Sequence, residues 1–128
     1  MIVDTSAVIT VLFGESGAER YDTAIAEARR CRMSVVNYLE AAIVLESRSG
    51  AAAGHELDAF LKEAEIELEA VTAEQAQAAR RAWRRFGKGN HPAGLNFGDC
   101  LAYALAEATG EPLLFKGGDF ALTDVESA

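Results

Sequence analysis

The amino-acid sequence predicts an α/β fold, a three-layer α/β/α sandwich around a mainly parallel central sheet. Two observations lead to this prediction. Short apolar segments alternate along the chain with longer segments of helical periodicity, as in a parallel sheet covered by helices on both faces. The chain has 128 residues, of which 50% are hydrophobic and 25% charged, a size and balance typical of one globular domain. We therefore expect a single domain over residues 1–128.

The first half of the chain contains strand and helix signals in alternation. Ser6 is a favourable N-cap for the apolar run that follows it. Asn37 occupies the same position before a helix in which we expect Leu39, Ile43 and Val44 to face inward. The expected elements, in order, are a strand at 2–3, helices at 7–13 and 16–30, a strand at 31–35, and helices at 37–47 and 54–64.

The second half repeats this alternation. Residues 66–71 alternate apolar and acidic side chains, which is the period of a half-buried strand. Thr72 and Asn96 are N-cap candidates, and Gly110 suits a helix C-terminus. The remaining expected elements are a helix at 72–86, a loop at 87–94, a helix at 96–109, a strand at 113–115 and an edge strand at 122–125.

Charge and cysteine content exclude several classes of protein. Twelve basic and 20 acidic residues give a net charge of −8, which excludes a generically basic protein that coats nucleic acid. The only thiols and imidazoles are Cys31, Cys100, His55 and His91, which fit neither a disulfide framework nor a zinc site. No apolar run approaches the ~20 residues of a membrane span, and the N-terminus lacks a basic leader, so we expect a cytoplasmic protein without a membrane partner.

Four acidic residues fall where ligands bind in open α/β sheets, beyond the carboxyl ends of the strands. Asp4 ends the first expected strand, and Asp119 follows the Leu113 strand. Glu40 and Asp99 lie in the first turns of expected helices. Singly, each acid has an ordinary explanation as a helix cap or a turn residue. Together, clustered carboxylates at a buried edge repel one another and need a cation.

The chemistry of this set favours a hard cation. Carboxylate oxygens are the ligands that Mg²⁺ or Mn²⁺ prefers over zinc. Such a site can lower the pKa of water and stabilise charge on a phosphodiester during in-line displacement. The sequence offers no Ser/His/Asp or Cys/His arrangement and no phosphate-binding loop of the GxxxxGK[ST] kind as a competing site.

Together these segments resemble a known family, the PIN-domain ribonucleases, and specifically the VapC toxins of VapBC toxin–antitoxin modules. The resemblance covers nearly the whole chain in the right order. The segments that carry it are Ile2-Val3-Asp4-Thr5-Ser6-Ala7, Asn37-Tyr38-Leu39-Glu40, residues 95–106 (LNFGDCLAYALA), residues 113–120 (LLFKGGDF) and Thr123-Asp124-Val125.

The resemblance implies a PIN-like sandwich and a Mg²⁺- or Mn²⁺-dependent endoribonuclease, the toxin of a type II module. The catalytic, metal-binding acids of the family match Asp4 and Asp99 most directly, then Glu40, then Asp119. Thr5 or Ser6 would be a hydroxyl that orders the site. The implied partners are an RNA substrate, a VapB-like antitoxin that blocks the acidic site, and a second copy in a homodimer that joins larger toxin–antitoxin complexes.

A basic segment on this acidic chain is a candidate for RNA binding. The residues are Arg80, Arg81, Arg84, Arg85 and Lys88. The i,i+4 spacing aligns the arginines in two short rows on one helix, which could guide the phosphate backbone while Trp83 or Phe86 stacks a base. The other interpretation is a solvated helix face with core aromatics.

Three further hypotheses remain open at this stage. One is a non-catalytic PIN-fold module that binds RNA or an antitoxin. Another is a phospho-acceptor or phosphatase domain, although Ser6 stands where phosphatases of the haloacid-dehalogenase type have a second acid. The last is DNA cleavage at the same site, because metal and phosphate contacts do not distinguish the two sugars.

Overall fold

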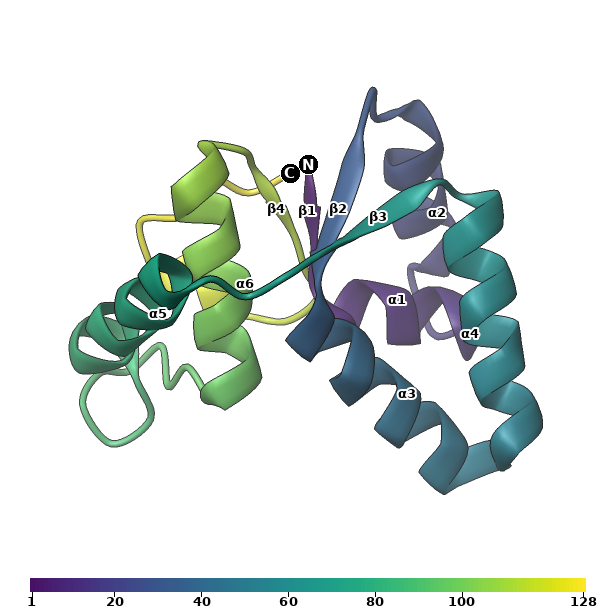
Figure 1. Cartoon of the computed structure of the whole chain (residues 1–128), viewed down its shortest axis with the longest axis horizontal. Helices are drawn as coiled ribbons and strands as arrows, with labels where there is room; N and C mark the ends of the chain where they lie inside the picture. The colour runs from purple at the N-terminus through teal and green to yellow at the C-terminus, as the bar shows by residue number, and fades with distance from the viewer.

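A four-stranded parallel sheet forms the centre of the structure, a computed structural model that describes all 128 residues (Figure 1). The strands follow the order β3-β2-β1-β4, and every pairing is parallel. Their bounds are β1 (Ile2–Val3), β2 (Cys31–Ser34), β3 (Ile66–Glu69) and β4 (Leu113–Leu114). The carboxyl ends of all four strands therefore point to one edge of the sheet, which is where the acidic residues were expected.

Helices cover both faces of the sheet, so the predicted three-layer α/β/α arrangement is confirmed. Helices α5 and α6 lie on one face, and helices α1 to α4 lie on the other (Figure 1). The bounds are α1 (Thr5–Leu12), α2 (Ala18–Glu27), α3 (Val35–Ser49), α4 (Ala51–Glu63), α5 (Ala73–Phe86), α6 (Phe97–Thr109) and a short 3-10 helix η1 (Phe120–Leu122). None of these helices is both long and apolar enough to cross a membrane.

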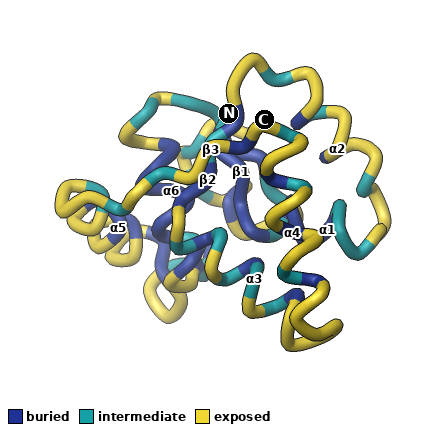
Figure 2. The backbone as a smooth tube through the Cα atoms, turned by 45° about the vertical axis from the view of Figure 1, so that its right-hand side comes forward, coloured by how far each residue is buried: buried dark blue, intermediate teal, exposed yellow.

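The alternation of side chains along the central strands divides the apolar interior in two. Ile2 and Leu113 pack with α5 and α6, whereas Val3 and Leu114 pack with α1 to α4. Successive residues of a strand point to opposite faces, so two adjacent apolar residues serve both layers. Figure 2 shows the result, with the central strands buried and the outer surfaces of the helices exposed.

Two predicted helix caps are displaced by one turn or less. Asp4, not Ser6, is the N-cap of α1, and its carboxylate accepts a hydrogen bond from the Ser6 amide. Ser34, not Asn37, caps α3 through a bond from the Val36 amide. In both cases the helix begins directly where a buried strand ends, and the earlier polar residue is the one that meets the free amides.

The direction of α3 also differs from the sequence prediction. Leu39 and Ile43 are not inward but 57% and 56% exposed. The face that packs into the core carries Asn37, Ala41 and Leu45 instead. The apolar stripe of Leu39 and Ile43 misled the prediction because nothing in the sequence shows which of two apolar stripes meets the sheet.

The C-terminal segment is the other correction. Residues 122–125 do not form an edge strand. Instead η1 occupies 120–122, and the backbone reaches the sheet only further on, where Leu113 pairs with Ser127 in an isolated parallel bridge. The side chain of Asp124, exposed in this segment, accepts a hydrogen bond from the Tyr103 hydroxyl and pairs with Arg85.

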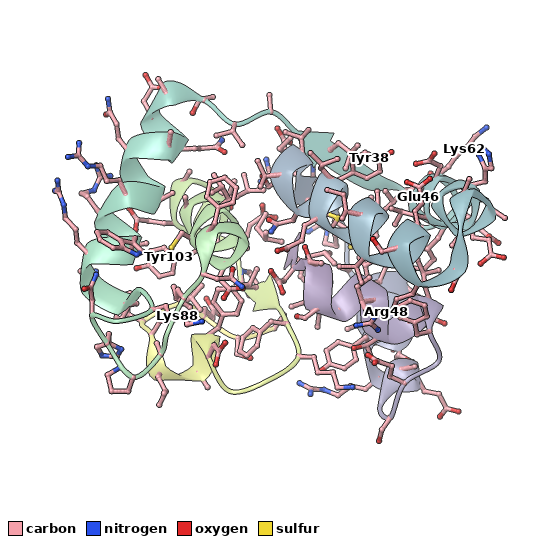
Figure 3. All side chains as sticks on the ribbon, turned by 90° about the horizontal axis from the view of Figure 1, so that it is seen from below. Tyr38, Glu46, Arg48, Lys62, Lys88 and Tyr103 are labelled. Carbon is pink, nitrogen blue, oxygen red and sulfur yellow. The ribbon has the colours of Figure 1, made fainter.

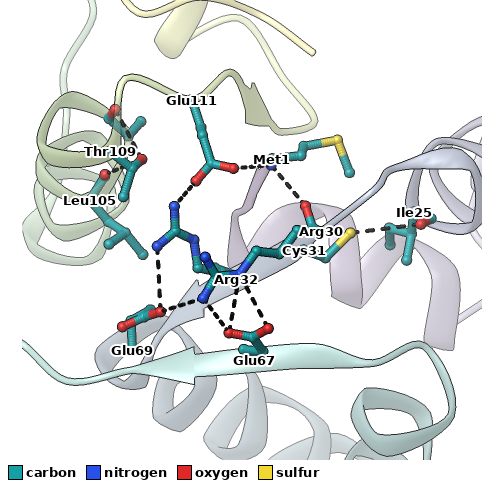
Figure 4. Close-up of polar contacts among 11 residues, drawn as sticks. Met1, Ile25, Arg30, Cys31, Arg32, Glu67, Glu69, Leu105, Thr109 and Glu111 are labelled. Atoms are coloured by element: carbon teal, nitrogen blue, oxygen red, sulfur yellow. Dashed lines mark hydrogen bonds and ion pairs between the residues drawn. The ribbon is translucent and has the colours of Figure 1, made fainter.

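An ion-pair network holds together the amino ends of the strands (Figure 4). The Met1 ammonium group donates to Glu111 at 2.8 Å, and Arg32 on β2 pairs with the same carboxylate. Arg30 and Arg32 continue the network to Glu67 and Glu69 on β3. The acidic side chains of the edge strand β3 are therefore paired along its length, from Glu67 near its amino end to Glu69 at its carboxyl end.

We predict that Leu105→Ala lowers the free energy of unfolding by about 2–5 kcal/mol, because the Leu105 side chain is 1% exposed and the substitution leaves a cavity. The matched control is Leu122→Ala, where the side chain is 55% exposed and a change within about 0.5 kcal/mol is expected. Urea unfolding followed by circular dichroism measures both. Equal losses in the two variants would contradict the assignment of Leu105 to the core.

Candidate functional site

A cleft of about 490 Å³ opens at the carboxyl edge of the sheet. Three of the four predicted acids, Asp4, Glu40 and Asp99, line this acidic cleft. They come from separate segments: the end of β1, the second turn of α3 and the first turn of α6. The other lining residues are Thr5, Ser6, Ile9, Thr10, Glu15, Val44, Arg48, Asn96 and Lys116.

Asp4 is the most buried of the acids, with 3% of its surface exposed. Its Oδ2 accepts hydrogen bonds from the Ser6 amide at 3.0 Å and from the Ser6 hydroxyl at 2.6 Å. The same hydroxyl accepts a bond from the Lys116 amide at 2.9 Å. Ser6 therefore holds one oxygen of Asp4 and ties it to the segment after β4. The other oxygen, Oδ1, is buried without any hydrogen-bond partner.

A chain of buried hydrogen bonds joins the three segments that carry the acids. The Thr5 hydroxyl donates to the backbone carbonyl of Asn37 at 3.0 Å. The Asn37 side-chain amide donates in turn to the carbonyl of Gly98 at 3.0 Å. Asn37 is completely buried, so losing this bond would leave polar groups without partners. Through these contacts, α1, α3 and α6 hold fixed positions around the cleft.

Gly98 lets Glu40 approach the start of α6. A Cβ atom added at Gly98 would lie 2.6 Å from Glu40 Oε2 and 2.7 Å from Oε1, closer than such atoms approach in proteins. The glycine is helical, so its role is the space it leaves and not an unusual backbone angle. The carboxylate of Glu40 therefore lies directly over the residue that precedes Asp99.

Asp99 has two roles at the start of α6. Its carboxylate accepts a bond from the Asn96 amide at 3.0 Å, and the Asn96 side chain accepts one from the Asp99 amide at 2.9 Å. This reciprocal pair is the capping box that the sequence indicated. The capping role and a place in the cleft are compatible, because one bond occupies only one of the lone pairs of a carboxylate.

The environment raises the pKa of both Asp4, which is buried, and Asp99, which is half-buried. Burial raises the pKa of Asp4 to about 6, opposed by the bonds from Ser6 and reinforced by the charges of Asp99 and Glu40. Burial likewise raises the pKa of Asp99 to about 6, and the charges of Glu40 and Asp119 add to the effect. The neighbouring acids therefore lie close enough to Asp4 and Asp99 to disfavour the ionised forms of these two aspartates, a pattern that marks functional-site candidates.

The remaining predicted residues lie at different depths around the cleft. Asp119 is exposed at the N-cap of η1 and is not a lining residue, although its charge reaches Asp99. Thr5 is buried and binds the backbone of α3, whereas Ser6 contacts Asp4 directly. Of the two hydroxyls proposed to order the site, Ser6 is therefore the one in contact with an acid.

The fit of the site to a metal ion depends on its donor atoms. Every acidic donor is a carboxylate oxygen, and Asp4 Oδ1 is a buried oxygen with no other partner, which suits a hard divalent cation. The acids line one cleft without forming a ready-made cluster of three His, Cys, Asp or Glu ligands. If a divalent cation binds, Asp4, Asp99 and Glu40 are the side chains placed to hold it.

The basic residues of α5 and of the loop that follows it fall on two sides of that helix. Arg80 and Lys88 line an apolar groove of about 680 Å³ between α5 and α6, together with Trp83 and Phe97. Arg85 faces away from this groove, where its guanidinium pairs with Asp124 at 3.4 Å. The groove and the acidic cleft share one lining residue, Asn96, so they adjoin each other.

Only one of the two aromatic residues proposed for base stacking is accessible. Trp83 is 49% exposed, whereas Phe86 is 7% exposed and packs against Tyr103 and His91. Cys100, next to Asp99, is also buried, and burial raises the pKa of its thiol to about 11. Phe86 and Cys100 are therefore core residues.

The structure adds residues in and behind the cleft that sequence reasoning did not assign to the site. Asn37 was taken for a helix cap, but its burial and its bond to Gly98 make it the link between α3 and α6. Arg48 and Lys116 line the cleft as its basic residues. The i+8 spacing from Glu40 to Arg48 was the one signal in the sequence that could have placed Arg48 on the same side of the helix.

Comparison with known proteins shows the family of this chain. The model of the PIN domain family matches residues 1–126. The chain is 54% identical to "Ribonuclease VapC" of Mycolicibacterium smegmatis over 125 residues, which covers 98% of this chain and 97% of that protein. It is 52% identical to "Ribonuclease VapC30" of Mycobacterium tuberculosis over 126 residues, which covers 98% and 95%.

Solved structures share the fold at lower sequence identity. The crystal structure of Mycobacterium tuberculosis VapC20, described as a sarcin-ricin loop cleaving toxin, superposes with a TM-score of 0.79 at 20% identity and covers 99% of this chain and 97% of that chain. A chain of a toxin–antitoxin complex from Klebsiella pneumoniae superposes with a TM-score of 0.74 at 14% identity and covers 96% and 92%.

We predict that Asp99→Asn stabilises the metal-free protein above pH 6 by on the order of 1–2 kcal/mol. The pKa of Asp99 rises from 3.8 to about 6 on folding, so the folded state holds its proton more tightly than the unfolded state. This group therefore favours folding most at about pH 4 and below, and that contribution is lost as the pH rises to about 6. Asparagine keeps the acceptor for the Asn96 amide without the charge.

Urea unfolding in EDTA at about pH 4 and about pH 7 measures this difference. The variant should gain stability over the wild type only at the higher pH. Asp22→Asn on α2, where the carboxylate is exposed, is the matched control and should show no such pH dependence. Equal stability of Asp99→Asn and wild type at both pH values would contradict the cause given for the raised pKa.

Proposed function

This chain belongs to the PIN-domain family and, within it, to the VapC ribonucleases, and from that premise we propose that it is a metal-dependent endoribonuclease that acts as the toxin of a type II toxin–antitoxin module. The observation that carries the proposal is the acidic cleft. Asp4, Glu40 and Asp99 come together there from distant parts of the chain, and the pKa values of both aspartates rise to about 6. Such carboxylates are costly to bury together unless a cation binds them.

We propose that Asp4, Glu40 and Asp99 hold Mg²⁺, with Mn²⁺ as the alternative, and that Asp119 contributes from the rim of the cleft. A divalent cation bound there supplies activation of the attacking water and stabilises charge on the phosphodiester during displacement. The all-oxygen donor set and the unpartnered Asp4 Oδ1 support this choice of ion.

The residues of the chain prepare the acids for this role. Ser6 occupies Oδ2 of Asp4, which leaves Oδ1 as the oxygen available to a ligand. With pKa values of about 6, Asp4 and Asp99 are mostly ionised at neutral pH and become protonated in mildly acidic solution. Metal binding and activity are therefore expected to fall together as the pH decreases below about 6, because a proton and a cation compete for the same oxygens.

We propose that α5 binds the RNA through the side that faces α6. Arg80 and Lys88 line the groove there, beside the exposed indole of Trp83. Arg84 is exposed and forms no ion pair. Arg81 and Arg85 complete the basic segment on the other row, and the pairing of Arg85 with Asp124 reduces the positive charge of that row. The groove adjoins the acidic cleft, so RNA bound along it would reach the acids.

We also propose that the toxin acts in the cytoplasm, pairs with a VapB-like antitoxin and forms a homodimer. Apolar side chains left exposed near the site support association with protein partners. Phe97 at the start of α6 is 76% exposed, and Leu39 and Ile43 on α3 are each more than half exposed. An apolar surface of this kind is stabilised when another protein covers it.

Cleavage of total cellular RNA by antitoxin-free protein tests the nuclease proposal directly. We predict discrete cuts with Mg²⁺ or Mn²⁺, none with EDTA, and a loss of at least a hundredfold in rate for Asp99→Asn, which removes a charged oxygen from the cleft (on the order of 3 kcal/mol in the barrier). The Asp22→Asn variant controls for a change of net charge and should cut normally.

Two results would overturn the assignment. Cuts that persist in the Asp99→Asn variant from a clean preparation would exclude Asp99 as a metal-binding acid. A folded wild-type protein that binds RNA and metal without cutting would favour a non-catalytic PIN-fold module that binds RNA or an antitoxin.

The proposal that RNA binds the side of α5 facing α6 can be tested by substitution of its arginines. Arg80→Gln should weaken binding of single-stranded RNA about threefold or more and make its salt dependence shallower, because one phosphate contact is lost. Arg81→Gln on the other row is the matched control and should have a smaller effect. Fluorescence anisotropy in EDTA over a range of salt concentrations measures both. A larger loss for Arg81→Gln would place the RNA on the opposite side of α5.

A further inference from the structure

Arg48 lies in the acidic cleft although it belongs to the far end of α3. Glu40, Val44 and Arg48 are spaced four residues apart and all line the cleft. Because a helix rises 1.5 Å per residue, the backbone positions of Glu40 and Arg48 are about 12 Å apart along α3. One side of this helix thus carries an acid at the end near Asp99 and a cation further out.

The Arg48 side chain is held in place by an aromatic ring. Its guanidinium lies over the ring of Phe13, with 5.0 Å between Cζ and the ring centroid. A guanidinium stacked in this way keeps its N–H donors at the edge of the plane, where they remain free to bind an anion. Phe13 directly follows α1, so the contact also fixes the position of Arg48 relative to Asp4 at the start of that helix.

Arg48 has no acidic partner despite its surroundings. It forms none of the ion pairs in the structure, whereas Lys116, the other cation of the cleft, is paired with Glu15 at 3.7 Å. The positive charge of Arg48 is therefore available to a ligand. A stacked, unpaired guanidinium at the rim of a cleft is suited to a phosphate group, which it can bind through two parallel hydrogen bonds.

The position of Arg48 complements that of the basic residues on α5 and in the loop after it. Figure 3 views the face at the carboxyl ends of the strands and shows Arg48 on one side and Lys88 on the other. The acidic cleft lies along the Arg48 side, and the groove lined by Lys88 adjoins it through Asn96. A polyanion that crosses the acids from the α5 side would meet no unpaired cation in the cleft beyond them except Arg48.

We propose that Arg48 binds a backbone phosphate of the RNA next to the scissile one, on the side of the acids opposite α5. This proposal rests on the proposed function and deepens it by assigning a second phosphate subsite. The acids repel the substrate backbone, and cations on both sides of them offset that repulsion and hold the strand across the cleft. Arg48 is thus a positioning residue that contacts substrate away from the reacting atoms.

The test compares Arg48→Gln and Arg48→Lys with Arg20→Gln. Arg20 is a matched control because its guanidinium also stacks on an aromatic ring, that of Tyr21 at 5.3 Å, but it does not line the acidic cleft. The probe is an end-labelled, single-stranded RNA pool of random sequence. Binding is measured by fluorescence anisotropy in EDTA, so no cleavage occurs, and urea unfolding confirms that each variant is folded.

Arg48→Gln is expected to weaken RNA binding about three- to tenfold and to reduce the slope of log affinity against log salt by about 0.7, the value for one phosphate contact on a single strand. Arg48→Lys should recover part of the affinity and the full slope, because a lysine retains the charge without the planar fork. Arg20→Gln should match the wild type. In cleavage assays with metal, Arg48→Gln should raise KM and leave most of kcat, since the contact lies away from the reacting atoms.

Failure of this inference can be told apart from failure of the proposed function. Wild-type affinity and slope for Arg48→Gln would overturn the phosphate subsite, whether or not the protein cuts RNA. The same holds if the wild type does not bind RNA. A wild-type protein that binds RNA with the predicted dependence on Arg48 but does not cut it with metal would overturn the nuclease and leave the subsite standing.

Discussion

The burial of Asp4 at the end of β1 is the constraint around which the rest of the site is arranged. A carboxylate with 3% exposure is stable only if its oxygens have partners, and Ser6 satisfies Oδ2 with two bonds. The same bonds begin α1 and, through the Lys116 amide, hold the segment after β4. Oδ1 is left without a partner and lies close to two other acids. The fold thus places a costly charge where a ligand can relieve the cost.

Helix α3 connects this constraint to the rest of the molecule because its sides have different roles. One side enters the core through Ala41 and Leu45, beside the buried Asn37 that bonds to Gly98. A second side lines the cleft, and a third leaves Leu39 exposed. Gly98 allows α3 and α6 to approach so closely that Glu40 lies over the start of α6. Core packing, the lining of the cleft and an exposed apolar surface are therefore coupled through a single helix.

The errors in the predicted helix caps share one physical origin. Ser6 and Asn37 have good capping side chains, and sequence reasoning assigned them to caps that Asp4 and Ser34 occupy. Propensity shows that a helix begins nearby, but only the end of the preceding buried strand decides which residue meets the free amides. Residues 122–125 were assigned to a strand for a similar reason, since an apolar pattern that short is compatible with several structures. At Asn96 and Thr72, where loops precede the helices, the predicted caps are the observed ones.

The sequence by itself determined the layer architecture and the placing of Asp4, Glu40 and Asp99 at one edge of the sheet, because both follow from local patterns: alternating strand and helix signals, and carboxylates at strand ends and helix starts. Only the tertiary structure decided how these acids meet. The packing of α3 against α6 brings Glu40 to Asp99, turns Leu39 outward and directs Arg48 into the cleft. The packing of α5 against α6 places Arg80 on the groove and Arg85 away from it. These outcomes depend on contacts between residues far apart in the chain, and the periodicity of one segment carries no information about the segment that packs against it.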